Sequence, residues 1–234
     1  MNNFIRVQNK KNFFQRIWDL SAVAKIIIFT SIISMVSFVL FNSSEKYLAY
    51  LALMPGNILA GKYILTLITH IFVHGGFGHL FVNMFVLFSL GSLCEKIIGQ
   101  KRFLLFYLLS GVFAGILSVV LSGLFGYGIG ERIFGSPNIY MVGASGAIFA
   151  IAGLYVVLLP KIKFSIIFLP FFTLPAYVMV PLALFVMWAL SFAWNWPIGN
   201  AAHFGGFLAG LIYGLYLKMK YRRKIEKLQR FFDR

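Results

Sequence analysis

Three kinds of side chain in this sequence could together carry out acyl transfer: a serine hydroxyl, imidazoles and an amide. Ser145 needs a general base, and a neutral His203 can accept the hydroxyl proton and later return it to a leaving amine. His79 and Asn83 lie four residues apart, so on a helix they share one face and can both donate to a developing oxyanion. The Ser145 backbone amide at a helix N-terminus is a third donor. The set predicts a serine nucleophile working with a histidine.

Other hydrolytic chemistries find little support in the sequence. Aspartate occurs only at Asp19 and Asp233, close to the two termini, which excludes a pair of catalytic aspartates. No His-Glu-x-x-His segment occurs, so that zinc-protease signature is absent. His70 and His74 precede His79 closely enough to suggest metal ligands, but no Asp or Cys accompanies them. We therefore predict no metal and no cofactor, and expect His74 to make structural hydrogen bonds.

The composition is that of a membrane protein. Of the 234 residues 60% are hydrophobic and only 12% are charged, and the mean hydropathy is +0.87. Because a membrane-spanning helix needs about 20 apolar residues, the long uncharged runs of the sequence hold six such helices. A turn at Trp194–Asn200, marked by Trp, Pro and Gly, divides the last run in two. The six spans are predicted at about 25–43, 78–95, 103–123, 143–160, 176–194 and 199–218.

The net charge of +15 invites a nucleic-acid interpretation, but the positions of the charges indicate membrane topology. Of 21 Lys and Arg residues, only Lys46, Lys62 and Arg132 fall on one side of the six predicted spans. Basic residues collect on the cytoplasmic side of membrane proteins, so both termini are predicted to be cytoplasmic. We expect no nucleic-acid partner.

One catalytic domain is predicted, flanked by two short basic segments. The domain covers residues 25–218, after a cytoplasmic N-terminal segment 1–24 and before a juxtamembrane tail 219–234. We expect the first span to be a retained helix, and Tyr47–Gly61 to be an interfacial loop on the outer side. In the tail, apolar residues at near-helical spacing indicate a helix lying on anionic lipid, with a partner-binding tail as the alternative. These residues are Ile225, Leu228, Phe231 and Phe232.

The predicted topology brings the chemical groups to one depth. Spans two, four and six all begin at the outer face, and each of the four polar residues lies near the start of one of them. Small residues follow on spans four and six at a spacing of three or four, which allows two helix backbones to approach closely in lipid. If these two faces meet, Ser145 and His203 meet as well. The small residues are Gly146, Ala150 and Gly153 on span four and Gly206, Gly210 and Gly214 on span six.

Three motifs in this order resemble those of the rhomboid intramembrane proteases. Gly143-Ala144-Ser145-Gly146 resembles the family's Gly-x-Ser-Gly motif. Ala202-His203-Phe204-Gly205-Gly206, with Gly210 four later, resembles Ala-His-x-x-Gly-x-x-x-Gly. The segment from His74 through His79 to Asn83 resembles His-x-x-x-x-His-x-x-x-Asn. Glu95, with Gly99 four later, matches an acidic residue at the end of the same helix, and we expect it to pair with basic residues.

The resemblance implies an all-α, six-helix rhomboid bundle that cleaves transmembrane segments of other membrane proteins near the outer face. It implies a Ser145–His203 dyad with an acyl-enzyme intermediate and an oxyanion site at His79, Asn83 and the Ser145 amide. Phe149 stands where members often have a tyrosine, so only ring stacking on His203 is expected. The other supporting positions are Gly143, Gly146, Gly206 and Gly210.

The expected partners are transmembrane protein substrates, which enter from the lipid between spans five and two, and membrane lipid itself. The expected location is the bacterial cell (inner) membrane, as a multi-pass protein. A catalytically silent rhomboid-like protein, which binds and escorts transmembrane helices, is the alternative. A small transporter is less favoured, because embedded acids and a two-fold repeat are missing from the sequence.

Overall fold

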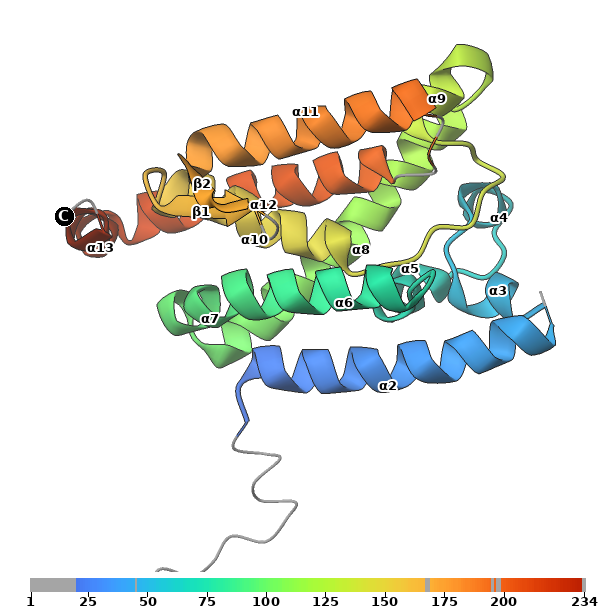
Figure 1. The fold of residues 1–234 in the computed structure, drawn as a ribbon, viewed down its shortest axis with the longest axis horizontal. Coiled ribbons are helices and arrows are strands. Elements are labelled where there is room, and N and C mark those ends of the chain that lie inside the picture. The colour runs from blue at the N-terminus through green and yellow to red at the C-terminus, as the bar shows by residue number, and fades with distance from the viewer. Residues whose placement is uncertain (1–19, 45, 167–168, 195, 197–198, 233–234) are drawn as a thin grey trace, which may run out of the picture.

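The computed structural model describes residues 20–44, 46–166, 169–194, 196 and 199–232. This part of the chain is mostly helical, and a long helical segment lies on each of the six predicted ranges. Figure 1 shows α2 along one side of the bundle, α6 beside it, and α11 on the opposite side. The long segments are α2 (Ala22–Ser43), α6 (Phe77–Val86) with the π-helix η2 (Leu87–Gly91) and α7 (Ser92–Ile98), α8 (Gln100–Phe125), α10 (Ser145–Leu158), α11 (Ala176–Trp194) and α12 (Asn200–Lys220).

Four of these segments are long and apolar enough to cross a membrane, namely Ala22–Ser43, Phe77–Ile98, Gln100–Phe125 and Ala176–Trp194. The chain is therefore a multi-pass integral membrane protein. The fourth predicted span, 143–160, is shorter than expected, because α10 has 14 residues. It is buried along most of its length, so protein and not lipid surrounds it. That all six helices cross, with both termini cytoplasmic, stays a prediction.

Short elements gather at the two ends of the bundle (Figure 1). The segment Tyr47–Gly61, expected as a loop, contains two short helices, and a bridge from Leu53 to Met141 ties it to the segment before α10. Pro55 supplies the fixed backbone angle at the start of the second short helix. The elements at the end of the bundle that contains Tyr47–Gly61 are α3 (Lys46–Leu51), α4 (Pro55–Leu59), α5 (Thr66–Thr69), η1 (His70–Phe72), η3 (Gly128–Gly130) and α9 (Glu131–Phe134).

The opposite end carries an antiparallel β-hairpin that the sequence analysis did not predict. Strands β1 (Lys163–Ile166) and β2 (Leu169–Pro175) pair with Lys163 opposite Pro175. The hairpin segment is uncharged after Lys163, so hydropathy alone did not separate it from the apolar run that leads into α11. Helix α12 ends at Lys220, two residues beyond the end expected for span six, and the last helix, α13 (Arg222–Phe232), follows after Tyr221.

The two predicted flanking segments are described only in part. Residues 1–19 of the predicted N-terminal segment lie outside the described residues, as do 195, 197 and 198 of the predicted turn before α12. The first long helix starts at Ala22, three residues before the expected position 25, because Ser21 caps it. Its Oγ accepts a hydrogen bond from the Ala24 amide at 3.1 Å. The domain boundaries remain predictions.

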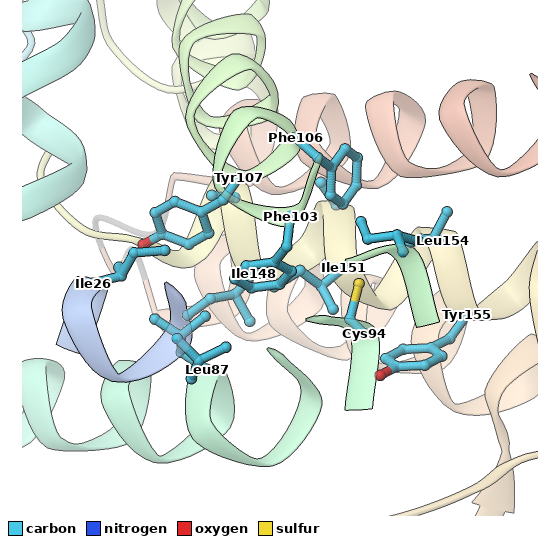
Figure 2. Close-up of a cluster of buried hydrophobic side chains, with 14 of the residues drawn as sticks. Ile26, Leu87, Cys94, Phe103, Phe106, Tyr107, Ile148, Ile151, Leu154 and Tyr155 are labelled. Atoms are coloured by element: carbon cyan, nitrogen blue, oxygen red, sulfur yellow. The ribbon is translucent and has the colours of Figure 1, made fainter. Parts of the chain in front are cut away.

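Side chains from several helices form one buried cluster around α10 (Figure 2). Ile26 of α2, Leu87 of η2 and Phe103 of α8 meet Ile148 and Ile151 of α10 there. Cys94, to which the sequence analysis assigned no role, is fully buried in the same cluster (Figure 2). Dispersion contacts of this kind hold helices together in lipid, where the hydrophobic effect contributes little between them.

Glu95 has a different use from the predicted pairing with basic residues. Its two carboxylate oxygens accept hydrogen bonds from the backbone amides of Ala22 and Val23, each at 2.9 Å. These amides belong to the first turn of α2, where no intrahelical acceptor exists and where the helix dipole favours a negative charge. Glu95 thus joins the end of α7 to the start of α2, across more than 70 residues of sequence.

We predict that Glu95→Ala destabilises the protein by about 3 kcal/mol, because it leaves two buried amides without an acceptor. Glu95→Gln keeps one acceptor oxygen and is expected to cost less. The measurement is thermal unfolding in detergent, followed by tryptophan fluorescence.

Glu226→Ala is the matched control. This glutamate makes an exposed pair with Arg222, so its loss is expected to change stability by about 0.5 kcal/mol or less. Equal unfolding temperatures for Glu95→Ala and the control would contradict the capping role.

Candidate active site

Ser145 and His203 are in hydrogen-bonding contact. Ser145 is the first residue of α10, and His203 lies in the first turn of α12. The Ser145 Oγ and the His203 Nε2 are 2.8 Å apart, although 58 residues separate them in sequence. This is the distance over which an imidazole can accept a proton from a hydroxyl. His203 is 6% exposed, so the pair is largely shielded from bulk water.

The contact follows from how closely α10 and α12 approach. A Cβ atom placed on Gly206 would overlap the carbonyl oxygen of Gly146, and one on Gly210 would overlap that of Ala150. The two backbones therefore touch at positions where no side chain stands between them. The small-residue faces predicted from the sequence do meet, and Gly146, directly after the nucleophile, is one of the contact points.

The second nitrogen of His203 is buried and has no hydrogen-bond partner among the described residues. No carboxylate therefore orients the ring there, in contrast to a Ser-His-Asp triad. The ring of Phe149, one turn after Ser145, lies against the imidazole with centroids 4.8 Å apart and planes inclined by 35°. Phe149 limits the orientation of the ring, and an aromatic face favours an imidazolium over it.

His79 and Asn83 lie beside the nucleophile on α6 and line the same cavity. The His79 Nδ1 accepts the Gly75 amide at 3.4 Å, which assigns the ring proton to Nε2. That Nε2 faces Gly143, whose φ of 125° suits glycine and whose missing Cβ would lie 3.1 Å from it. Asn83 donates one amide N–H to the His79 carbonyl at 2.9 Å. Its second amide N–H has no hydrogen-bond acceptor among the described residues.

The structure reveals a histidine network behind the nucleophile that the sequence analysis only partly anticipated. His74 is fully buried, and its Nδ1 bonds to the Ser34 Oγ at 2.9 Å. Its Nε2 accepts the Ala144 amide at 3.4 Å, and Ser34 donates onward to the Phe72 carbonyl at 3.0 Å. His74 therefore links α2 to the residue just before Ser145. The hydrogen bonds expected of His74 are present, but nothing in the sequence singled out Ser34.

His70, which had no assigned role, holds the same segment from another direction. Its Nδ1 donates to the Thr66 carbonyl at 2.8 Å, and its ring packs against Gly115 of α8. Its own carbonyl accepts the Gly143 amide at 2.8 Å. Burial lowers the pKa of His70 to about 4, and burial together with the neighbouring His79 lowers the pKa of His74 to about 3. Both rings are neutral at physiological pH.

A cavity of about 1640 Å³ contains this site and extends between α6 and α11. Ser145, His203 and His79 stand at one end of it. The cavity continues past the middle of the bundle to Tyr155 of α10 and Phe164 of β1. The α6 wall includes Val82 and Val86, and the α11 wall includes Met179, Ala183 and Met187.

Comparison with known proteins decides the family. A family model described as the rhomboid domain matches residues 61–220. The chain belongs to the rhomboid family. Among relatives, RHOMBOID-like protein 5 of Arabidopsis thaliana is 32% identical over 154 residues, which cover 66% of this chain and 44% of that protein. The mitochondrial presenilin-associated rhomboid-like protein of Homo sapiens is 33% identical over 149 residues, 62% of this chain and 36% of that protein.

The mitochondrial Rhomboid protein 1 of Saccharomyces cerevisiae is 29% identical over 180 residues, which cover 72% of this chain and 47% of that protein. The rhomboid chain thus spans less than half the length of each of these relatives. The family assignment confirms the rhomboid-type membrane fold predicted from the sequence motifs, which is mostly helical and also contains the strands β1 and β2. The rhomboid family includes intramembrane serine proteases that act on transmembrane proteins. Two of the three relatives carry mitochondrial names, so they lend no support to the predicted bacterial membrane.

We predict that the rhomboid chain loses stability as the pH falls from about 6.5 towards 4. His70 and His74 bind protons more weakly when folded than when unfolded, where a histidine has a pKa near 6.5. The unfolded state therefore gains protons first, and stability that is complete above pH 6.5 is lost below it. The measurement is the unfolding temperature in detergent between pH 7.5 and 5, above the range where most carboxylates titrate.

His74→Gln keeps a polar side chain but cannot titrate, so its unfolding temperature is expected to fall less steeply over that pH range than the wild-type value. Parallel curves for the variant and the wild type would show that His74 does not contribute.

Proposed function

We propose that this rhomboid protein is an intramembrane serine endopeptidase that uses Ser145 as nucleophile and His203 as general base. The observation that carries the proposal is the 2.8 Å contact between the Ser145 Oγ and the His203 Nε2. It stands at one end of a cavity that opens between two membrane helices. A serine that served only packing would need no imidazole aligned on its hydroxyl.

In the proposed reaction, His203 takes the hydroxyl proton while the Ser145 oxygen attacks the scissile carbonyl carbon. The tetrahedral intermediate collapses when His203 returns that proton to the leaving amine, which departs and leaves an acyl-enzyme ester. Water, deprotonated by the same imidazole, then hydrolyses the ester and restores the serine. Since no carboxylate supports the imidazolium, Phe149 is proposed to stabilise and orient it.

The negative charge on the carbonyl oxygen is proposed to be met by three donors. The Ser145 amide is at the first position of α10, where it has no intrahelical acceptor and the helix dipole adds a favourable field. The His79 Nε2–H, which faces Gly143, and the free amide N–H of Asn83 complete the set. Preorganised donors of this kind typically contribute about 2.7–4 kcal/mol each to transition-state stabilisation.

We propose that the substrates are transmembrane segments that reach the site sideways, between α6 and α11. A membrane-embedded segment cannot cheaply leave the lipid, and the cavity lies between these two helices. Because a nucleophile cannot reach the carbonyls of an intact helix, the cleaved segment should have small residues at the scissile bond and helix-weakening residues just below. Cleavage near the outer face follows from the predicted topology. The bacterial cell membrane remains our proposal for the compartment, although two relatives carry mitochondrial names.

A catalytically silent rhomboid that binds and escorts transmembrane helices is the alternative function. It would use the same cavity, but it has no need for a serine hydroxyl bonded to a buried imidazole. The two functions therefore differ in what loss of that hydroxyl does.

Ser145→Ala and His203→Ala are each expected to abolish cleavage of a model transmembrane substrate in detergent or proteoliposomes. The protein should remain folded, because both side chains border the cavity and neither belongs to the buried apolar cluster around α10. Cleavage is measured by gel analysis of the products, and folding by the unfolding temperature.

Ser89→Ala, another serine that lines the cavity, is the matched control and is expected to retain activity. Full turnover by the purified Ser145 variant would refute the dyad. No turnover by the wild type on any transmembrane substrate, together with retained binding, would favour the escort function.

A cross-link between α6 and α11 is expected to block cleavage of transmembrane substrates. Val82→Cys and Met187→Cys, in a Cys94→Ala background, put reactive thiols on opposite walls of the cavity, to be joined by a short bis-maleimide. The same pair capped with N-ethylmaleimide controls for the modification itself. Normal cleavage of a transmembrane substrate by the cross-linked protein would rule out entry between these helices.

A further inference from the structure

Three cations surround one aromatic ring at the end of the bundle that carries α7, the hairpin and α13. The guanidinium carbon of Arg102 lies 5.7 Å from the centroid of the Tyr221 ring. The amino groups of Lys220 and Lys224 lie 5.8 Å and 5.9 Å from the same centroid. Because all three charges lie within 5.9 Å of one ring centroid, any two of them are separated by at most about twice that value. They come from the start of α8, the end of α12 and the start of α13.

The cluster of Arg102, Lys220 and Lys224 lacks an anion. Within the described part of the chain, no carboxylate forms an ion pair with any of the three. Lys220 is instead bonded to the Tyr216 hydroxyl at 2.8 Å. All three side chains are exposed. Basic residues are expected at this end from topology alone, but topology does not require three of them to converge on one ring.

Arg102 is also in an unfavourable place for a cation without a counter-ion. It lies in the first turn of α8, where the helix dipole is positive and favours negative charge. Lys220, in the last turn of α12, is placed favourably. An anion bound between them would interact with the three cations and with the unpaired amides of the α8 N-terminus together.

Exposed apolar side chains continue from this cluster towards the middle of the bundle. On α12, Tyr216 and Ile212 lie one turn apart and are 45% and 55% exposed. On α8, Leu105 and Leu109, three and seven residues after Arg102, are exposed as well. The rings of Phe106, Tyr213 and Tyr216 stack in sequence from α8 to α12. The cationic cluster thus adjoins exposed apolar side chains on both helices.

We propose that Arg102, Lys220 and Lys224 bind the phosphate of an anionic phospholipid, whose acyl chains lie along the exposed faces of α8 and α12. A free phosphate would use the cations but not the apolar surface. The amphipathic α13 is consistent with a position at the lipid headgroups. Ile225 is buried against the bundle, and the Gln229 amide donates to the Leu158 carbonyl at 3.1 Å, which holds the helix against the end of α10.

The orientation of α13 supports the same assignment. The helix is seen nearly end-on in Figure 1, so it lies across the direction of α12. Four basic residues of α13 besides Lys224 are exposed, and Phe231 is 71% exposed. A helix with basic and apolar exposed residues that lies across the ends of membrane helices fits the headgroup layer. The four residues are Arg222, Arg223, Lys227 and Arg230.

The test is the unfolding temperature of the purified full chain in detergent with added phosphatidylglycerol. At a lipid concentration about 100-fold above Kd, we expect a rise of roughly 5 °C over the same concentration of phosphatidylcholine. Arg102→Gln with Lys224→Gln should abolish the rise. Lys46→Gln with Lys62→Gln removes the same charge from exposed positions at the opposite end of the bundle, and should retain the rise.

Each other outcome would overturn the lipid site. An equal rise with glycerol 3-phosphate or inorganic phosphate would indicate a site for soluble anions. Equal loss in both double variants would indicate a response to overall charge, and an equal rise with phosphatidylcholine would indicate acyl-chain binding alone. If the wild type did not respond to phosphatidylglycerol, the lipid site would be refuted and a protein partner would be the alternative ligand of the basic cluster. None of these readouts depends on proteolysis.

Discussion

The site depends first on the direct contact between the backbones of α10 and α12. Gly146 and Gly206 meet where any Cβ would overlap a carbonyl oxygen, so the interaxial distance is set by main-chain atoms and not by adaptable side chains. A lipid environment provides little hydrophobic force between helices, and close packing of small residues takes its place. Ser145 and His203 each stand within three residues of this contact, so their 2.8 Å separation follows from it. A larger residue at either glycine would separate the nucleophile from its base before it changed any catalytic group.

A second constraint is that polar groups inside the bundle must find partners there. Several of the buried polar side chains that do so also join elements far apart in sequence. Glu95 accepts the first amides of α2, and His74 connects α2 to the Ala144 amide. The Tyr155 hydroxyl of α10 donates to the Leu90 carbonyl of the π-helix η2 at 2.6 Å. These bonds make the structure around α10 rigid, which is what a preorganised oxyanion site requires. His203 Nδ1, unpaired among the described residues, is an exception, and it lies at the proposed catalytic centre.

The proposed catalytic residues and most of the basic side chains lie in separate parts of the molecule. The proposed catalytic residues form the charge-free core of the site, with neutral imidazoles, a hydroxyl and an amide in a largely apolar cavity. Most cations lie at the opposite end, where Arg102, Lys220 and Lys224 gather around Tyr221. This separation follows from the cost of burying charge in lipid, which confines cations to the interfaces. The same cations that determine topology are then available to bind anionic headgroups.

The helical segments, the rhomboid family and the residues that meet at the site could be predicted before the fold was known, because they depend on hydropathy, spacing and motif. Apolar runs of about 20 residues cannot avoid the membrane, and small residues at a spacing of four define a packing face on any helix. What Glu95 and His74 bind became known only from the fold, because backbone amides, which nearly every residue carries, are partners of both and no sequence pattern marks them. The fold also made Lys163–Ile166 and Leu169–Pro175 paired strands, since apolar stretches of that length are compatible with strand or helix until their neighbours are known. The gathering of three cations on Tyr221 likewise depends on how the ends of α8, α12 and α13 come together in space.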